Sequence, residues 1–596
     1  MKWNRVLAVA SLMSVSALAA CGDDDPTGPG GDNPPPAVTN LGSTITDGFD
    51  LTVTWDVSEG ATSYQVVLSN DDGSLTETVT TPTVTFDRVS GGTAYTVAVT
   101  AGSTGGTSAA TTINVVTPGL NETFYNIAAY NNLEADPMMD PSVFEFGTRA
   151  TPPDFTLGAM PTGYVAATIA SDGLVASTDG RTLVSTDYAG AIAPGTALAD
   201  AWYNGWTIWA ADGSDSRDVS GATIVDVDAD ILVNTTWTSG NVYRLLKPVF
   251  VGTDCGADGT AAGCVEATLT IEPGTTIIGL SAAEVAPERG AYLVVSRGST
   301  IIADANANEA DKTVRPTEAN TIVFTSAKAT GSRASGDWGG IVINGAAQIN
   351  SGDEATGEGD SGIYGGTDDT DGSGILRGVR IEFAGDDVTP TDQLNGLALQ
   401  GVGAGTTLSY IQIHYNRDDG IEPFGGAASV DHLVVTGIGD DSVDGTDGYR
   451  GFMQFVLGQQ NGADADNGFE ISNNGDAEDL SPQSTAVIAN ATMIGAGEGV
   501  VSGGIAGPES DNGIQFREGS NYRVFNSIFT GFGEGGFCIR DAQTIVNALN
   551  KIDGQVAPTT TLSAEGLIMW DNQAAGAAEN CAPCGGGSSG RPSLTG

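Results

Sequence analysis

The sequence is poor in positive charge. Its 596 residues include 23 lysines and arginines against 74 aspartates and glutamates, which gives a formal net charge of -51, and it has two histidines. Nucleic-acid binding is excluded as a function class, because it depends on clustered Lys and Arg that displace counterions from phosphates. An excess of carboxylates favours divalent cations as partners, although it also keeps a secreted protein soluble.

Patterns typical of long helices are also scarce. Only 16% of the residues are charged, whereas 84 residues are glycine and 40% are hydrophobic, and Leu-rich runs are few. This composition suits turns and strands, so we expect an all-β protein. The chain is too long for one ordinary domain unless much of it is a repeat that grows in one direction.

Long apolar runs are absent after the N-terminus, where Lys2 and Arg5 precede an apolar run from Val6 to Leu18 that is typical of a secretory signal. The run ends in "LAAC", which resembles a bacterial lipobox. The resemblance implies cleavage before Cys21, lipidation of that cysteine and a protein anchored at the cell envelope. Because Gly22 rather than Asp follows, we expect the outer membrane, facing the exterior or the periplasm. The alternative is a plain signal peptide with an accidental cysteine.

A tether and a small domain are expected next. Residues 21–37 are almost only Asp, Gly and Pro and cannot form a core. Residues 38–117 contain short alternating strands such as "SYQVVLSN" (63–70) between Gly, Asp and Ser turns, the pattern of a β-sandwich. Trp55 in "DLTVTWDV" and Tyr95 in "GTAYTVAVTAG" make this stretch resemble a fibronectin type III module. The resemblance implies a spacer or a binding unit, and we expect a spacer.

Residues 118–250 are expected to form an aromatic-rich cap or the N-terminal part of the following domain. They include "DAWYNGWTIWAADG", in which Trp202, Trp206 and Trp209 lie close together. Exposed indoles pack well on sugar rings, which makes these three tryptophans candidate ligand-binding residues. The alternative is that they form the packed core of the cap.

From residue 251 to 580, short β-branched runs alternate with Gly, Asn and Asp and leave little room for crossover helices. An Asn or Asp, followed by Gly or Ser and then a hydrophobic residue, recurs at Asn395, Asp419, Asp441, Asn467 and Asn512. The separations are 24, 22, 26 and 45 residues, and we interpret the last as about two steps. This repeat predicts a parallel β-helix. We expect these pairs at coil corners, where Asn, Asp and Gly tolerate left-handed backbone conformations.

Three stretches carry a resemblance to a known family: "GDWGGIVINGAAQIN" (336–350), "NGLALQGVGAGTTLSYIQIHYNRDDGIEPFGG" (395–426) and "DHLVVTGIGDDSVDGTDGYRGFMQF" (431–455). They resemble a large group of secreted bacterial right-handed β-helix lipoproteins. The resemblance spans roughly residues 200–535 and implies a right-handed parallel β-helix at the cell surface, without an assigned reaction. The expected organisation is a signal peptide (1–20), a tether (21–37), a fibronectin type III-like sandwich (38–117), a cap (118–250), the β-helix (251–580) and a flexible tail (581–596).

Acidic residues gather beyond what the turns require. Asp440, Asp441, Asp444 and Asp447 lie in the Gly-interrupted stretch "DDSVDGTDG". We consider them a candidate Ca²⁺ site, because this hard cation takes six to eight oxygen ligands from carboxylates and carbonyls. The alternative is a solvated acidic turn.

Catalysis is the competing interpretation, because β-helices host polysaccharide lyases and glycosidases. A Ca²⁺-dependent lyase or a hydrolase acting on uronate-rich polysaccharide needs carboxylates and a basic group. The candidates are Asp418, Asp419, Asp440 and Asp441 with Arg417 and Arg450. His414 and His432 lie in strand patterns and are interpreted as structural. Since Asp pairs also accompany the turns, we favour a non-catalytic surface protein that binds a glycan or another surface protein.

Five cysteines remain besides the lipobox cysteine. Cys255 and Cys264 flank "CGADGTAAGC" and are expected to form a local disulfide in an oxidising compartment. Cys581 and Cys584 have CxxC spacing, but the sequence offers no second ligand pair for zinc. We therefore expect Cys538 to pair with one of them.

Overall fold

The computed structural model describes residues 33–45, 51–70, 73–86, 94–116, 125–129, 147–285, 290–389, 392–460, 465–496, 500–501, 505–506, 510–533, 535–549, 562–570 and 580–582. The signal peptide, Cys21, most of the tether and nearly all of the C-terminal tail lie outside the described residues. The chain divides into two compact units, residues 1–118 and 119–596. Among the described residues, no helix is long and apolar enough to cross a bilayer.

The first unit is an antiparallel β-sandwich, as predicted. One sheet has the order β1–β2–β5, and the other has the order β4–β3–β6–β7 with β8 also paired to β6. The strands are β1 (Gly42–Ile45), β2 (Leu51–Thr54), β3 (Ser63–Asn70), β4 (Gly73–Val79), β5 (Thr83–Phe86), β6 (Ala94–Ser103), β7 (Gly106–Thr107) and β8 (Thr111–Val116). Trp55 and Tyr95 are buried in its core, where Trp55 meets Tyr64 edge to face at 5.2 Å.

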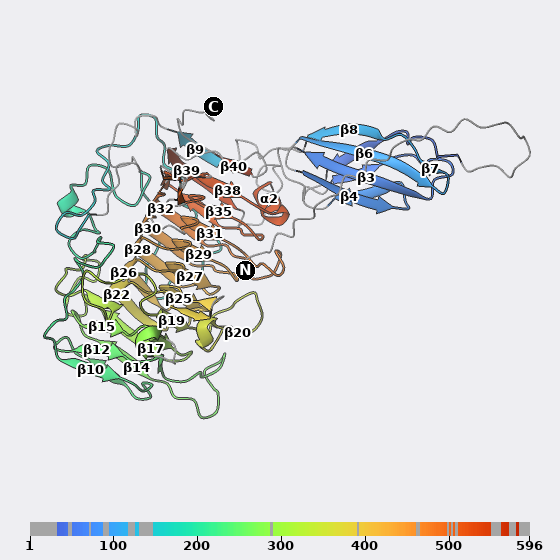
Figure 1. Ribbon diagram of the computed structural model, residues 1–596. Helices are drawn as coiled ribbons and strands as arrows, with labels where there is room; N and C mark the ends of the chain where they lie inside the picture. The colour runs from blue at the N-terminus through green and yellow to red at the C-terminus, as the bar shows by residue number, and fades with distance from the viewer. Residues whose placement is uncertain are drawn as a thin grey trace, which may run out of the picture. The chain divides into compact units, whose positions relative to one another are not determined.

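The second unit is a parallel β-helix, whose stacked coils are seen side-on in Figure 1. A 16-stranded sheet, here called the wall, forms one part of the β-helix. Its strands are β9 (Tyr125–Ala129), β10 (Ile224–Val227), β11 (Thr235–Trp237), β12 (Val242–Leu245), β14 (Thr268–Ile271), β15 (Thr276–Gly279), β17 (Thr300–Asp304), β18 (Ile322–Ser326), β22 (Gly374–Glu382), β26 (Thr407–His414), β28 (Ser429–Thr436), β30 (Phe452–Gln459), β32 (Val487–Ile494), β36 (Arg523–Phe525), β37 (Ile528–Thr530) and β39 (Ser563–Trp570).

A 10-stranded sheet, here called the second wall, completes the coils. Its strands are β13 (Val249–Val251), β16 (Tyr292–Val295), β19 (Gly340–Asn344), β25 (Leu397–Gln400), β27 (Ile421–Phe424), β29 (Val443–Gly445), β31 (Phe469–Ile471), β35 (Gln515–Phe516), β38 (Phe537–Ile539) and β40 (Asn580–Ala582). The shorter elements are α1 (Ala282–Val285), α2 (Ala542–Leu549), η4 (Leu198–Asp200), η5 (Glu358–Asp360) and the hairpins β20 (Ala355–Thr356)–β21 (Ile363–Tyr364), β23 (Asp387–Thr389)–β24 (Asp392–Gln393) and β33 (Val500–Val501)–β34 (Ile505–Ala506). Because successive side chains alternate between the two faces of a strand, residues such as Ile421, Val443 and Phe469 fill the interior.

The repeated Asn and Asp residues stack at one corner of the coils. The N–H of the residue after each corner donates to the carbonyl of the next corner residue: Gly396 to Asp419, Gly420 to Asp441, Ser442 to Asn467 and Gly468 to Asn512. The last bond places residues 467 and 512 on neighbouring coils. The interpretation of their separation as two steps is therefore wrong, because this single coil carries an insertion that contains the hairpin β33–β34.

Left-handed backbone is not the reason for glycine at these corners, which corrects the prediction. Neither the five corner residues nor the residues that follow them have a positive φ. Glycine is required for space, since a Cβ on Gly420 would lie 2.4 Å from the carbonyl oxygen of Ser442. Left-handed residues occur instead at one register position of the 16-stranded sheet, at Gly378, Tyr410, His432, Phe455, Asn490, Asn526 and Gly566.

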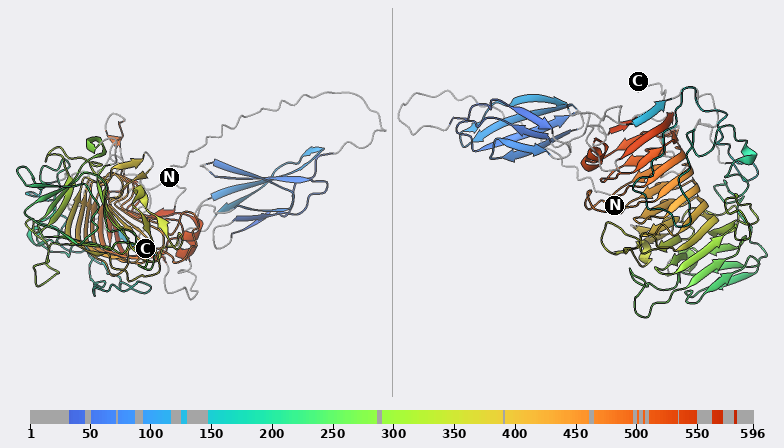
Figure 2. Two further views of the ribbon diagram at one scale, coloured as in Figure 1. Left: turned by 90° about the horizontal axis from the view of Figure 1, so that it is seen from below. Right: turned by 180° about the vertical axis from the view of Figure 1, so that it is seen from behind.

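A strap, residues 147–221, lies along the outside of the β-helix (Figures 1 and 2). At three places, a side-chain amide of the wall accepts a hydrogen bond from the N–H of a strap residue and donates one to the C=O of the same residue. The pairs are Asn526 with Ala167, Gln454 with Val184 and Gln412 with Ile208. The strap therefore runs from the C-terminal coils toward the N-terminal ones.

Two of the candidate sugar-stacking tryptophans belong to the strap and are fully buried. Trp206 and Trp209 are 0% exposed, and Trp209 packs against Val434 and Leu457 of the wall. A ring without exposed surface cannot stack on a sugar, so the assignment of these two residues to ligand binding is wrong. They form the packed core that attaches the strap. Trp202 is only partly buried.

Three of the cysteines that the structure describes are disulfide-bonded. Cys255 and Cys264 form a disulfide with their Cα atoms 5.1 Å apart. Cys538 is also disulfide-bonded, and Cys581 lies opposite it in the antiparallel pairing of β38 with β40. Cys584 lies outside the described residues.

Candidate metal and ligand sites

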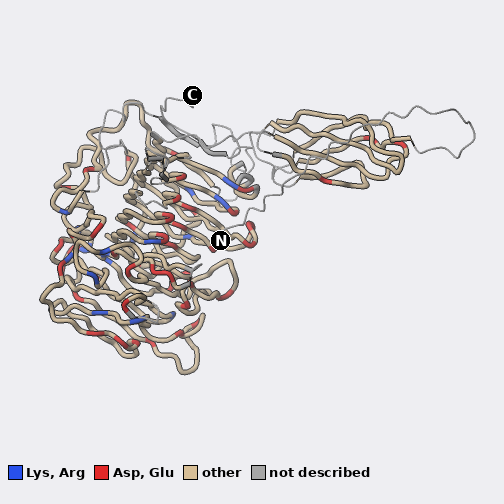
Figure 3. Tube along the Cα trace, in the orientation of Figure 1, with Lys and Arg blue, Asp and Glu red and all other residues tan. Residues whose placement is uncertain are grey.

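Eight carboxylates gather on the outside of three successive coils at the second wall and its corner. We call them the acidic ladder: Asp418, Asp419, Glu422, Asp440, Asp441, Asp444, Asp466 and Glu470. Figure 3 shows acidic residues on successive coils of the β-helix. Asp444 lies opposite Glu470 in the strand register, and each follows a residue that points inward. The alternation of the strand therefore directs both carboxylates outward.

Seven of the eight carboxylates, all except Glu470, form three groups in which carboxylate oxygens lie within 4.8 Å of one another. The groups are Asp418/Asp419/Asp440, Asp419/Glu422/Asp444 and Asp440/Asp441/Asp466. Asp419 and Asp440 each belong to two groups, so the three groups form one continuous set of oxygens. Such a set matches the ligands of a hard divalent cation.

Hydrogen bonds fix several of these carboxylates. Asp419 Oδ1 accepts from the N–H of Asp441 at 3.0 Å, and Asp441 Oδ1 accepts from the N–H of Asn467 at 2.6 Å. Asn395 donates to Glu422 at 2.6 Å through its side-chain amide. The corner residues therefore position acceptor oxygens on successive coils.

Burial and mutual repulsion shift the titration of the acidic ladder upward. Burial, followed by neighbouring carboxylates, raises the pKa of Asp419, Glu422 and Asp441 well above the ordinary values. Burial and the charge of Glu470 raise the pKa of Asp444 to about 7, and burial raises that of Glu470 to about 7. Ionisation of the whole cluster is therefore disfavoured unless a cation compensates its charge.

The predicted metal site is only partly assembled. Asp440, Asp441 and Asp444 belong to the acidic ladder, and Asp444 lies in strand β29 rather than in a loop. Asp447 does not belong to it, because its carboxylate accepts from Ser351 at 2.9 Å and from Asn474 at 3.0 Å. Its assignment as a ligand of the same ion is therefore wrong.

The two predicted catalytic arginines form ion pairs away from the acidic ladder. Arg417 pairs with Asp387 at 2.6 Å, and Arg450 holds Asp369 through two bonds of 2.6 and 2.7 Å. In the part of the chain that the structure describes, neither arginine is paired with Asp419, Asp440 or Asp441. The assignment of both arginines to a lyase site is therefore not supported by the geometry.

Sequence reasoning missed a different arginine. Arg517 pairs with Glu470 at 2.7 Å, and Gln515 donates to the same carboxylate at 2.9 Å. Both residues lie on the coil that begins after Asn512. Counting the 45-residue separation as two steps places this coil one step too far from Glu470. Had the separation been taken as a single coil, the register would have placed Gln515 beside Glu470.

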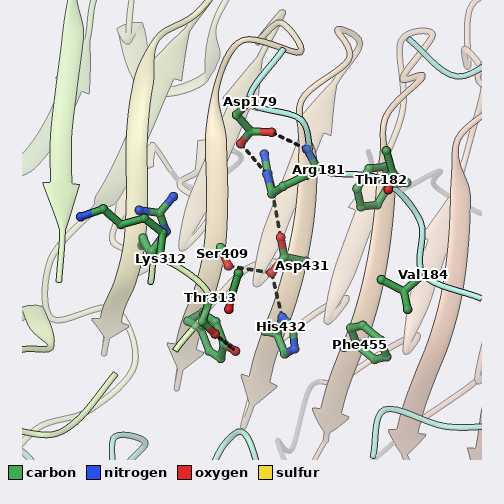
Figure 4. A pocket seen from close by; sticks show the side chains of 13 residues that line it. Asp179, Arg181, Thr182, Val184, Lys312, Thr313, Ser409, Asp431, His432 and Phe455 are labelled. Atoms are coloured by element: carbon green, nitrogen blue, oxygen red, sulfur yellow. Dashed lines mark hydrogen bonds and ion pairs between the residues drawn. The ribbon is translucent and has the colours of Figure 1, made fainter. Parts of the chain in front are cut away.

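A second candidate site is a cleft of about 380 Å³ between the strap and the wall, shown in Figure 4. We call it the aromatic cleft. Its lining includes Asp179, Arg181, Thr182, Val184, Lys312, Thr313, Arg377, Ser409, Tyr410, Asp431, His432, Phe452 and Phe455. Tyr410 and His432 stack with ring centroids 4.4 Å apart, and Phe455 follows His432 at 4.9 Å. Trp202 meets His432 edge to face at 5.1 Å.

The two histidines have different environments. His414 is fully buried, its Nδ1 is 2.7 Å from the Thr436 hydroxyl and its Nε2 is 3.1 Å from the carbonyl of Ala210, as a structural residue would be. His432 lies in the aromatic cleft with 23% of its side chain exposed. Its interpretation as a residue of the wall alone is therefore incomplete.

The stacked parallel sheets define the class of protein: a parallel β-helix preceded by an antiparallel sandwich. The outward faces of its coils carry the carboxylates and the cleft described above. The chain belongs to the family of pectate-lyase-like beta helix domains, whose model matches residues 230–573.

Comparison with solved structures gives short matches. The fn3 domain of human collagen alpha-1(XX) chain is 28% identical, with a TM-score of 0.14, over 16% of this chain and 93% of that one. The FN5 domain of Drosophila Lar is 18% identical, with a TM-score of 0.13, over 14% of this chain and 98% of that one. No curated protein matches the chain.

Proposed function

We propose that this chain is a non-catalytic, Ca²⁺-binding β-helix that holds a polysaccharide at the cell envelope. The observation that carries the proposal is the acidic ladder, in which seven carboxylates form three groups whose oxygens lie within 4.8 Å of one another. Membership of the pectate-lyase-like family supports a carbohydrate as the ligand. The ion pairs of Arg417 and Arg450 elsewhere in the fold support a non-catalytic role.

Calcium suits the acidic ladder for two reasons. The ion accepts six to eight oxygens in flexible geometry, and a group such as Asp419, Glu422 and Asp444 supplies three. It would also replace the protons that the raised pKa values indicate. Remaining coordination positions would be open to the carboxylates or hydroxyls of a polysaccharide.

The experiment is calorimetric titration of Ca²⁺ into the full chain at pH 7.5. We expect saturable heat that is lost in Asp419→Asn/Asp444→Asn, because these residues share one group with Glu422. Asp447→Asn is the matched control, since Asp447 is acidic and close in sequence but its carboxylate accepts from Ser351 and Asn474. Absence of heat, or equal loss in the control, would exclude the ladder as the cation site.

The envelope location rests on the lipobox resemblance of residues 18–21, which lie outside the described residues. We expect a radiolabelled fatty acid to be incorporated into the wild-type chain and not into Cys21→Ser. We also expect the wild type in the membrane fraction and the variant in the soluble fraction. Incorporation of label into both would place the lipid at another residue.

The alternative is a Ca²⁺-dependent lyase, and one observation favours it. Arg517 pairs with Glu470 at the edge of the acidic ladder, where a lyase would place its basic residue beside the cation. Eliminative cleavage of polygalacturonate leaves an unsaturated product that absorbs in the ultraviolet. If the wild type forms this unsaturated product and Arg517→Lys does not, the chain is a lyase and the non-catalytic binding function is refuted.

A further inference from the structure

The aromatic cleft is built at a position where the backbone disfavours its residues. Tyr410, His432 and Phe455 have φ values of 51°, 54° and 59°, which is the left-handed region. At the same register position, the neighbouring coils have glycine or asparagine: Gly378, Asn490, Asn526 and Gly566. Left-handed conformations of bulky residues are strained and concentrate at functional sites. The three rings therefore need an explanation beyond the fold.

Polar contacts hold the middle ring in one orientation. His432 Nδ1 donates to Asp431 at 2.7 Å, and the same carboxylate accepts from Ser409 at 2.6 Å and pairs with Arg181 at 3.2 Å, as Figure 4 shows. Although burial raises the pKa of Asp431, its hydrogen bond and ion pair with His432, followed by Ser409 and Arg181, keep it below the ordinary value. Nε2 of His432 has no hydrogen-bond partner among the described residues. It is fixed at the cleft and available to a ligand.

The charges of the cleft are already balanced. Arg181 pairs with Asp179 at 2.6 Å as well as with Asp431. Arg377 pairs with Asp304 at 2.8 Å. The Lys312 ammonium donates to the carbonyl of Ala307 at 2.9 Å, which leaves its charge in place, so the three cations Arg181, Arg377 and Lys312 are matched in number by Asp179, Asp431 and Asp304. A ligand with a net negative charge would find no cation in excess here, in a chain with a net charge of -51. The cleft therefore suits a neutral ligand.

We propose that the aromatic cleft binds a hexose or pentose unit of a neutral glycan. Its volume of about 380 Å³ falls in the range of about 300–1,000 Å³ that small-molecule sites occupy. Tyr410, His432 and Phe455 line the cleft and would supply apolar surface against which the C–H groups of a pyranose pack. His432 Nε2 meets a hydroxyl on the same side. This site is separate in its residues and in its chemistry from the acidic ladder, and it does not depend on the ladder binding Ca²⁺.

The test is calorimetric titration of the full chain with tetrasaccharides of β-1,4-linked glucose, mannose and xylose and with tetragalacturonate. We expect saturable binding of at least one neutral tetrasaccharide, with affinity unchanged by EDTA. His432→Asn and Phe455→Asn should each weaken that binding at least tenfold. Asparagine occupies this register position in the coils of residues 490 and 526, so both variants are compatible with the fold.

Asp419→Asn/Asp444→Asn is the control that separates the two sites, and it should retain neutral-sugar binding. Three results would overturn the proposal: no saturable heat with any neutral member, binding of tetragalacturonate alone, or unchanged affinity in both cleft variants. A Ca²⁺ titration without heat would refute the ladder and leave the cleft intact.

Discussion

Removal of Ca²⁺ is expected to destabilise the β-helix at pH 8 and to have little effect at pH 5. The pKa of Glu470 is raised to about 7 by burial, from an ordinary value of 4.5, and that of Asp444 is also raised to about 7. A carboxyl whose pKa is higher in the folded state stabilises the fold while it is protonated. That stabilisation is fully present below pH 4.5 and is lost as the pH rises through about 7.

The magnitude follows from the shift at Glu470, which is 8% exposed. Its pKa rises from 4.5 to about 7, and each pKa unit corresponds to about 1.4 kcal/mol, so ionisation of this one group lowers the free energy of unfolding by about 3 kcal/mol. Calcium at a hundred times its dissociation constant would return about 2.7 kcal/mol. The residues whose pKa is lowered, such as Glu318 at about 2, lose their contribution in the acidic range and do not compensate between pH 5 and 8.

The assay is urea unfolding at pH 5 and pH 8, in EDTA and in Ca²⁺, followed by hydrogen–deuterium exchange of the peptides that contain β27, β29 and β31. Glu470→Gln retains an acceptor for Gln515 and removes the charge, and Arg517 keeps its ion pair with Glu518 at 3.0 Å. The variant should therefore abolish about 3 kcal/mol of the loss at pH 8. If stability in EDTA is constant or rises between pH 5 and 8, or if Ca²⁺ stabilises equally at both, the reasoning is refuted.

Three further outcomes are expected. Gly420→Ala should lower the free energy of unfolding by about 1–3 kcal/mol, because its Cβ would overlap the next coil. Gly240→Ala should not lower it, since a Cβ there would have nothing within 4 Å. Equal urea midpoints of the two variants would contradict this. Gln412→Ala should speed proteolysis of the strap, since it leaves the N–H and the C=O of Ile208 without their partners, at a cost of roughly 1–3 kcal/mol each. An unchanged rate of cleavage would show that these two hydrogen bonds are not needed to hold the strap. Cys255→Ser/Cys264→Ser, which opens a loop with a sequence separation of 9, should cost about 2–3 kcal/mol in thermal or urea unfolding, and an unchanged midpoint would count against that loop-closure estimate.

The solenoid could be predicted from the sequence because its stacking imposes a spacing that is visible in Asn395, Asp419, Asp441 and Asn467. The spacing stopped being informative at Asn512, since an insertion within a coil lengthens a separation just as an additional coil does. The reason for glycine at the coil corners could not be predicted from the repeat either. A residue chosen for backbone conformation and one chosen for lack of space look identical in sequence, and only the contact between Gly420 and the next coil distinguishes them.

The acidic ladder was partly predictable and the aromatic cleft was not. Asp440, Asp441 and Asp444 stand close together in sequence, whereas Glu470 joins them only through the strand register. Tyr410, His432 and Phe455 are separated by more than twenty residues each, and in sequence each reads as an ordinary strand residue. The cleft also requires the strap, whose path along the wall depends on amide contacts such as that of Gln454 with Val184.

One row of outward positions on the second wall shows that the acidic ladder is not a requirement of the fold. Along the register this row begins with Phe250, Val294, Val342 and Ala398, then becomes Glu422, Asp444 and Glu470, and continues with Gln515. The apolar half packs into a cluster with Tyr292 and Leu394, so apolar residues satisfy this position where a loop covers it. Carboxylates stacked on adjacent strands repel by about 1 kcal/mol in water and about 4 kcal/mol at a protein surface. A polar neutral residue, as at Gln515, would avoid that cost. Arg517 compensates the charge of Glu470, and the proposed cation would compensate those of Glu422 and Asp444.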